Sequence, residues 1–152
     1  PFGEGTKSGC ERAAVANACG QDAAEAGLRF PPCDDDQLPI VLRPAAVGGW
    51  LERDGLVEVV SSLERDGRPV PRDLRWGVYV VFAAPGAYTA GCFADYGLVT
   101  SPCGGFAALY RPYHLIGLEL GISVASVGVR GEPTGAPAAW RGEARSRRRG
   151  AA

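Results

Sequence analysis

Short apolar runs alternate with turns along the chain, and this pattern predicts interleaved strands and helices. Residues 56–62 and 77–83 are rich in β-branched and apolar side chains, which is typical of strands. The turn Arg65-Asp66-Gly67-Arg68 falls between them. A third strand is expected at residues 106–110, entered through Gly104-Gly105. Together these runs predict a sheet.

The first predicted helix covers residues 9–19. Ser8 and Glu11 have the spacing of a capping box, and Gly20 is a natural residue to end the helix. Four-residue spacing places the pair Val15–Cys19 on one stripe, which we expect to carry the apolar side of the helix.

Two further helices are expected downstream. Residues 87–96 form a short helix stopped by Gly97, and residues 113–129 are almost continuously apolar with small residues at helical intervals. The second pattern predicts a buried, closely packed helix. Between the first helix and the first strand, residues 21–44 are rich in aspartate and proline, which favours an irregular connection. We therefore expect an α+β or α/β fold, with a mixed sheet and packed helices in a single domain at 1–137.

The composition narrows the class of protein. The 152 residues are 46% hydrophobic and 22% charged, with a formal net charge of -1, as in an ordinary globular domain. No overall positive field indicates nucleic acid, and the apolar stretches are too short or too interrupted to span a membrane. We therefore expect neither as a partner. The arginine-rich residues 138–152 lack apolar periodicity and are expected to form a disordered tail, with a nucleic-acid-binding arm as the less favoured alternative.

The cysteines indicate the compartment. They are odd in number and include no C-x-x-C pair, so we predict reduced thiols in the cytoplasm and neither a zinc site nor a complete disulfide framework. The triplet Asp34-Asp35-Asp36 favours a solvated turn or helix start over a cation site, because no spaced ligands accompany it. No metal is predicted. Since the chain begins at Pro1 and contains no methionine, we expect it to be a piece of a longer protein. The five cysteines are Cys10, Cys19, Cys33, Cys92 and Cys103.

The run from Tyr110 to Glu119 gathers the most reactive side chains. His114 is the single histidine of the sequence and the default candidate for proton transfer near neutral pH. Its alternative role is structural, at a junction between strand and helix. Arg111 has the planar fork that suits a carboxylate or phosphate, and with Tyr113 and Glu119 it would line the substrate side.

The glycine-rich opening at residues 3–9 matches neither common phosphate-binding motif. Ser8 stands where a dinucleotide fingerprint needs its third glycine, and Thr6 separates Gly5 from Lys7 where a nucleotide loop needs direct succession. Lys7 still precedes a predicted helix N-terminus, where anions are favoured. It is therefore a candidate for holding a phosphate or carboxylate, or for steadying a developing alkoxide.

Three blocks of the sequence carry a family resemblance. They are EGTKSGCERAAVANACG at 4–20, VEVVSSLERDGRPVPRDLRWGVYVVF at 57–82, and LYRPYHLIGLELGISVASVGVRGEPTGAP at 109–137. Together they resemble bacterial NAD(P)-dependent oxidoreductases related to homoserine dehydrogenase, a group that includes deoxyxylulose-phosphate reductoisomerase-like enzymes. The resemblance covers roughly residues 4–137.

The resemblance implies a parent with a Rossmann domain, a central catalytic and oligomerising domain, and a C-terminal SAF domain, of which this chain matches the middle part. It implies that Lys7 is a catalytic lysine or a ligand for a substrate anion. Glu4 stands at the family's aspartate position, where it preserves the negative charge on a longer side chain. We expect Glu4 to bind substrate. The arginine-rich end departs from the SAF pattern, as a frameshift or a premature stop would make it do.

The expected function is the substrate or catalytic domain of a cytoplasmic NAD(P)-dependent oxidoreductase acting on a small polar or phosphorylated hydroxy compound. The parent would use NAD(P) and form a homo-oligomer. The chain alone would bind no cofactor and be inactive, because it lacks a dinucleotide fingerprint. The alternatives are a noncatalytic ligand-binding or oligomerisation module, in which the helix at 113–129 packs against a second copy, and a nonfunctional gene fragment.

Overall fold

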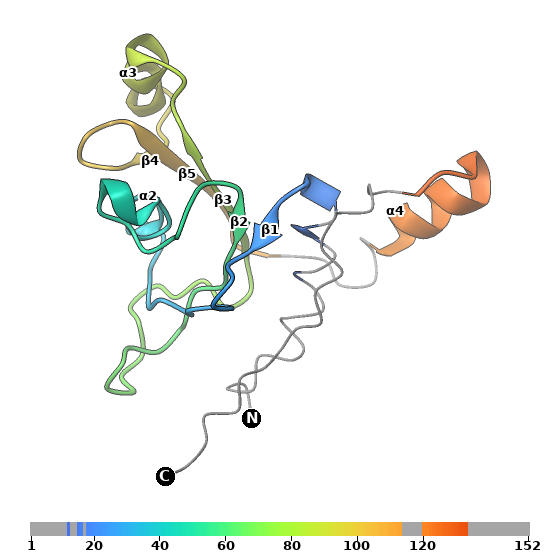
Figure 1. Cartoon of the computed structure of the whole chain (residues 1–152), viewed down its shortest axis with the longest axis horizontal. Coiled ribbons are helices and arrows are strands. Elements are labelled where there is room, and N and C mark those ends of the chain that lie inside the picture. The colour runs from blue at the N-terminus through green and yellow to red at the C-terminus, as the bar shows by residue number, and fades with distance from the viewer. Residues whose placement is uncertain (1–11, 13–14, 17, 114–119, 134–152) are drawn as a thin grey trace. The chain divides into compact units, whose positions relative to one another are not determined.

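The computed structural model describes residues 12, 15–16, 18–113 and 120–133. Short helices and strands are interspersed along the chain, which confirms the predicted α+β class (Figure 1). The chain divides into two compact units. The first unit comprises Pro1–Arg29, Gly55–Val59 and Leu120–Ala152, and the second comprises Phe30–Asp54 and Val60–Glu119. The predicted domain boundary at 137 and the predicted tail lie outside the described residues.

A helix in the first unit ends where the sequence predicted. Arg12, Val15, Ala16 and Cys19 are helical, and Gly20 follows with a φ of 65°. The predicted apolar stripe was wrong, because Val15 is 45% exposed and Cys19 is also exposed. The buried stripe is Arg12 and Ala16, the latter only 2% exposed. These two are also four residues apart, but their stripe is rotated by about 100° around the helix. The small alanine allows close packing on that side.

Two very short strands pair in the first unit. β1 (Asp22–Ala23) and β2 (Leu56–Val57) lie parallel. The strand predicted at 56–62 is therefore much shorter than expected. Directly after β2, the carboxylate of Glu58 accepts a hydrogen bond from the backbone N–H of Arg29 at 3.0 Å. The ladder ends at Val57, and Ser61 then forms an isolated parallel bridge with Pro32.

Most of the described side chains in the last helical segment are exposed. α4 (Leu120–Ala125) continues as one π-helical turn, η2 (Ser126–Arg130). The prediction of a buried, closely packed helix was wrong for these residues. A Cβ atom built on Gly121 or Gly128 would meet no atom within 4 Å, so these glycines do not serve close packing. Residues 114–119 of the predicted helix lie outside the described part. Its exposed large apolar side chains are Val124 (72%), Val127 (60%) and Val129 (84%).

The second unit is organised by an antiparallel sheet. It contains β3 (Val78–Ala83), β4 (Val99–Thr100) and β5 (Phe106–Arg111), in the order β3-β5-β4 (Figure 1). The predictions for β3 and β5 are confirmed. Parallel and antiparallel pairings thus lie in two separate sheets rather than in one.

Helices flank this sheet. α3 (Ala87–Asp95) follows β3 and ends before Gly97, whose φ of 71° suits glycine, as predicted. Phe93 of α3 is buried and meets the Phe82 ring edge to face, with ring centroids 5.4 Å apart. This contact fixes α3 on β3. The 21–44 connection is irregular as expected and contains α2 (Leu38–Val41), with the 3-10 helix η1 (Ala45–Val47) after it.

The core of the second unit lies on one face of the sheet. Tyr79, Val81 and Tyr110 pack against it from β3 and β5. Because strand side chains alternate between faces, the neighbouring positions of these strands point to the other face. The buried centre consists of Cys33, Leu38, Leu42, Leu74 and Ala108.

The acidic triplet forms a turn before α2, as the sequence predicted. Arg72 closes it: Nη2 lies 3.6 Å from Asp34 Oδ2 and 3.3 Å from Asp35 Oδ1, and it also bonds to Asp36. Across the described part of the chain, His, Cys, Asp and Glu side chains form no group of three suited to a metal ion. Nor does that part contain a helix of the length and apolarity needed to cross a membrane.

Candidate functional site

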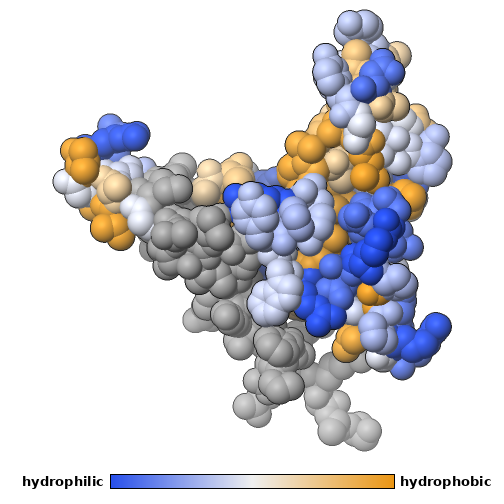
Figure 2. Space-filling model, turned by 180° about the vertical axis from the view of Figure 1, so that it is seen from behind, coloured by the Kyte–Doolittle hydropathy of each residue, from blue (hydrophilic) through white to orange (hydrophobic). Residues whose placement is uncertain are grey.

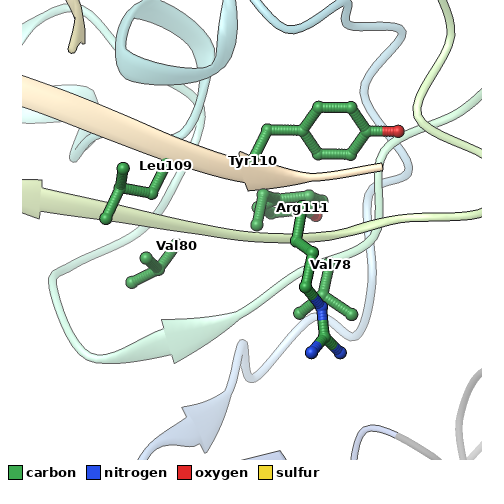
Figure 3. Close-up of a pocket in the computed structure, with 6 residues that line it drawn as sticks. Val78, Val80, Leu109, Tyr110 and Arg111 are labelled. Carbon is green, nitrogen blue, oxygen red and sulfur yellow. The ribbon is translucent and has the colours of Figure 1, made fainter. Parts of the chain in front are cut away.

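An apolar hollow of about 370 Å³ lies on the paired strands β3 and β5 of the second unit (Figure 3). Figure 2 shows hydrophobic side chains gathered on this unit beneath α3, where the sheet lies in Figure 1. The hollow is an open feature of the surface. Its lining residues are Val78, Tyr79, Val80, Leu109, Tyr110 and Arg111.

The strand register produces this hollow. Val80 lies directly opposite Leu109, and Val78 lies opposite Arg111, so all four share one face of the sheet. In Figure 3 they lie on one side of the ribbon, and Tyr110 points to the other. All three apolar members are exposed. The result is an apolar strip with a guanidinium at one end.

Gly77 lets the strands meet at this end. A Cβ atom built on Gly77 would overlap the ring of Tyr110 and the carbonyl oxygen of Arg111. The backbone N–H of Gly77 also donates to the carbonyl oxygen of Leu74 at 3.1 Å. Glycine is needed here for space, so this residue helps to set the positions of Tyr110 and Arg111.

Arg111 and Tyr113 are predicted site residues that the structure brings together. The guanidinium carbon of Arg111 lies 5.2 Å from the centroid of the Tyr113 ring, in the range of a cation–π contact. Both side chains are exposed. A guanidinium has the planar geometry to bind a carboxylate or a phosphate by two parallel hydrogen bonds. This pair is therefore suited to hold the anionic group of a ligand beside the apolar strip.

The other predicted site residues lie outside the described part of the chain. They are Glu4, Lys7, His114 and Glu119. Their catalytic and substrate-binding roles stay predictions.

Tyr110 is a lining residue that the sequence reasoning did not select. Burial raises the pKa of its phenol, and the charges of Asp35 and Asp73 raise it further. Tyr110 therefore stays protonated and can donate a hydrogen bond. Asp73 is itself a fixed anion, because Arg75 donates to it from Nε at 2.7 Å and from Nη2 at 2.6 Å, and these bonds lower the pKa of Asp73. Successive side chains of a strand point to opposite faces of the sheet, and this alternation along β5 was the sequence signal that places Tyr110 on the face opposite to Arg111.

A dinucleotide cofactor has no fitted site in the described residues. The turn from β3 to α3 is the nearest candidate, because a strand–turn–helix unit can present backbone N–H groups to a pyrophosphate. Only Gly86 stands in that turn, so the three-glycine spacing is missing. No step involving the cofactor is assigned to this turn.

Comparison with known proteins gives the family. The chain matches no curated protein at a significant level. It does match a family described as "Oxidoreductase DRL, catalytic domain" over residues 1–120, a range that includes the hollow and the pair Arg111–Tyr113. This confirms the oxidoreductase part of the resemblance, whereas the homoserine dehydrogenase relationship and the SAF domain stay predictions. The chain therefore belongs to the family "Oxidoreductase DRL, catalytic domain" and is an oxidoreductase catalytic domain.

Proposed function

We propose that this chain supplies the substrate-binding and catalytic part of an NAD(P)-dependent oxidoreductase that acts on a small polar or phosphorylated hydroxy compound. The family match over residues 1–120 is the observation that carries the oxidoreductase class. The substrate class is supported by the guanidinium of Arg111 at the end of the apolar strip. The strip takes the carbon skeleton, and the guanidinium takes the anionic group.

The nicotinamide would supply the hydride acceptor or donor when bound. The chain's own residues would manage the oxygen of the substrate, since oxidation of an alcohol releases a proton and reduction of a carbonyl takes one up. Lys7 and His114 are the proposed residues for that proton, with Lys7 also steadying negative charge on the oxygen. Glu4 and Glu119 are proposed to orient the hydroxyl groups of the substrate.

Arg111 and Tyr113 are proposed to bind rather than to react. The guanidinium of Arg111 carries only N–H donors, in a fixed planar fork that suits an anionic group. Its contribution is to fix the substrate by two parallel hydrogen bonds. Loss of Arg111 would then weaken binding of anionic compounds and leave neutral analogues unaffected.

The test is a calorimetric titration of small phosphorylated hydroxy compounds and of their unphosphorylated analogues into the purified chain. Binding of a phosphorylated compound that is lost in Arg111→Gln and retained in Arg68→Gln would support the proposal. Arg68 is a matched control because it is an exposed arginine paired with Asp66 in the 65–68 turn, away from the lining of the hollow. Equal affinities in both variants would contradict it.

The second part of the proposal is that the chain alone does not turn over substrate with a nicotinamide cofactor. The described residues lack a three-glycine strand–turn–helix unit, and the opening residues 3–9 lack its spacing. A fluorescence titration with NADPH should show no saturable binding. Tight binding would overturn this part and leave the role of Arg111 untouched.

One observation favours a second role in assembly. Val124, Val127 and Val129 are exposed within α4 and η2, and exposed apolar side chains that lie close together often mark an interface. We propose that this segment contacts a second copy in a homo-oligomer. Analytical ultracentrifugation of the wild type and of Val127→Lys is the test, and a monomeric wild type at all concentrations would refute it.

A further inference from the structure

The turn between β4 and β5 holds an exposed thiol in a fixed position. Ser101, only 2% exposed, accepts a hydrogen bond at Oγ from the backbone N–H of Phe106 at 3.2 Å, and its own backbone N–H donates to the carbonyl oxygen of Phe106 at 2.9 Å. The N–H of Gly104 donates to the carbonyl oxygen of Ser101 at 2.8 Å. These bonds close the turn and present Cys103 at its tip.

Three groups that can donate a hydrogen bond converge on this sulfur. Ser101 Oγ lies 3.3 Å from Cys103 Sγ, and Arg43 Nη1 lies 3.9 Å from it. The backbone N–H of Gly105 is the third donor. They come from the buried start of the turn, from the segment after α2 and from the entry to β5. The site is thus assembled by tertiary structure.

Arg43 is held in place from its other side. A Cβ atom on Gly49 would overlap the carbonyl group and side-chain stem of Arg43, so this loop wraps closely around the arginine. Arg43 Nε is fully enclosed and has no hydrogen-bond partner within the described residues. The ion pairs of that part of the chain give Arg43 no carboxylate. The sulfur of Cys103 is therefore the acceptor that its guanidinium faces.

These contacts favour the thiolate form of Cys103. The pKa of its thiol is lowered, first by the Ser101 hydroxyl, then by the N–H of Gly105, and also by the charge of Arg43. Cys33 provides the opposite case in the same unit. It is fully buried, it donates to the carbonyl oxygen of Asp34, and burial together with Asp34 and Asp35 raises its pKa to about 12. Of these two thiols, only Cys103 is accessible and poised to react.

We propose that Cys103 is a modification site that undergoes thiol–disulfide exchange with low-molecular-weight disulfides. The Cys103 thiolate attacks one sulfur of the disulfide and forms a new S–S bond. The original S–S bond breaks, and the second half leaves as a thiolate that water or buffer protonates. The disulfide supplies the oxidising equivalent, so no other oxidant is needed. Ser101, Gly105 and Arg43 favour the ionised form of the attacking sulfur, which is exposed to the disulfide.

The experiment compares two chains that both keep Cys33. One retains Cys103 with Cys10→Ser, Cys19→Ser and Cys92→Ser; the other retains Cys19 with the remaining three changed. Each is mixed with dithiobis-nitrobenzoate, and release of the coloured thiolate is followed over a range of pH. Glutathione disulfide followed by mass spectrometry checks the product. We expect Cys103 to react faster than Cys19 at neutral pH, with a pH midpoint below that of an ordinary thiol.

Variants of the donors separate this site from a merely exposed cysteine. A positive charge at the distance of Arg43 in a water-like dielectric favours the thiolate by about fivefold, but the lower basicity of that thiolate partly offsets the gain in rate. Arg43→Gln should therefore slow the reaction by about two- to fivefold at neutral pH. The pH midpoint of the reaction should rise in Arg43→Gln, and Arg43→Lys should restore much of the rate. Arg68→Gln should change neither the rate nor the midpoint. Equal rates for Cys103 and Cys19, or an unchanged rate and midpoint in both Arg43→Gln and Ser101→Ala, would overturn the proposal. Circular dichroism confirms that the compared variants are folded.

Discussion

Gly77→Ala is the most direct test of how the hollow is built. The added methyl group would meet the Tyr110 ring and the backbone carbonyl of Arg111 at the same time. The ring can turn, but the carbonyl belongs to the antiparallel ladder in which Val78 faces Arg111. One end of β3 must therefore move away from β5. Overpacking of this kind typically costs about 1–3 kcal/mol, and the backbone contact places the expected loss of stability in the upper half of that range.

The assay is urea unfolding of the wild type and the variant, followed by circular dichroism. Gly91→Ala is a matched control, because Gly91 lies within α3 and a Cβ atom there would meet nothing within 4 Å. Alanine is the better helix former, so this control should gain about 0.5–1 kcal/mol. The same chemical change thus has opposite expected signs at two positions. If Gly77→Ala unfolds at the wild-type midpoint, the close contact at the end of β3 and β5 does not exist, and the argument for the position of Arg111 fails.

Three further predictions test other contacts. Arg72→Gly and Arg72→Ala both lose the ion pairs with the acidic triplet. Arg72 has a φ of 51°, a region unfavourable for residues with a side chain, so the glycine variant should be the more stable of the two by about 1 kcal/mol in thermal unfolding. Phe93→Ala, which removes a buried ring against Phe82, should cost about 3 kcal/mol or more in urea unfolding, and a loss below 1 kcal/mol would contradict the packing of α3. The pKa of Asp73 is lowered by hydrogen bonds from Arg75, so this pair stabilises the fold above the ordinary carboxyl pKa and loses its effect as the pH falls through the lower folded value. Asp73→Asn should therefore be less sensitive to acid than the wild type, and an unchanged acid unfolding curve would refute this.

Local signals predicted the elements that the structure confirms. α3 was expected because Gly97 ends it, and β5 because Gly104 and Gly105 precede a run of apolar residues; both glycine signals act within a few residues of the element that they bound. Gly20 ended the first helix for the same reason. The ending of a helix or strand at glycine depends on the local backbone conformation and not on the rest of the fold.

Properties that depend on distant parts of the chain were predicted less well. Small residues in α4 matched the pattern of close packing, but the space around Gly121 and Gly128 is open, and spacing alone does not say what surrounds a helix. Residues 56–62 looked like a strand, yet only Leu56 and Val57 pair in a strand ladder, and further along Ser61 forms an isolated bridge with Pro32. A strand needs a neighbour in the fold, and the sequence of one strand does not provide it.

The candidate site was also predicted only where local chemistry was enough. Arg111 was selected by chemistry, because the planar fork of arginine suits a carboxylate or a phosphate, and Tyr113 was expected to line the substrate side with it. The apolar strip was missed, since Val78 and Val80 reach Leu109 only through the cross-strand register of β3 and β5. About thirty residues separate the two partners along the chain, and no periodicity within either strand fixes that register.

The central claim is that the strip on β3 and β5, with Arg111 at its end, receives the substrate. The most direct measurement is a backbone amide NMR titration of the wild-type chain with a small phosphorylated hydroxy compound. We expect the largest shift changes to fall on residues 78–80 and 109–113, and to vanish in Arg111→Gln. Changes concentrated elsewhere, or unchanged in that variant, would contradict it.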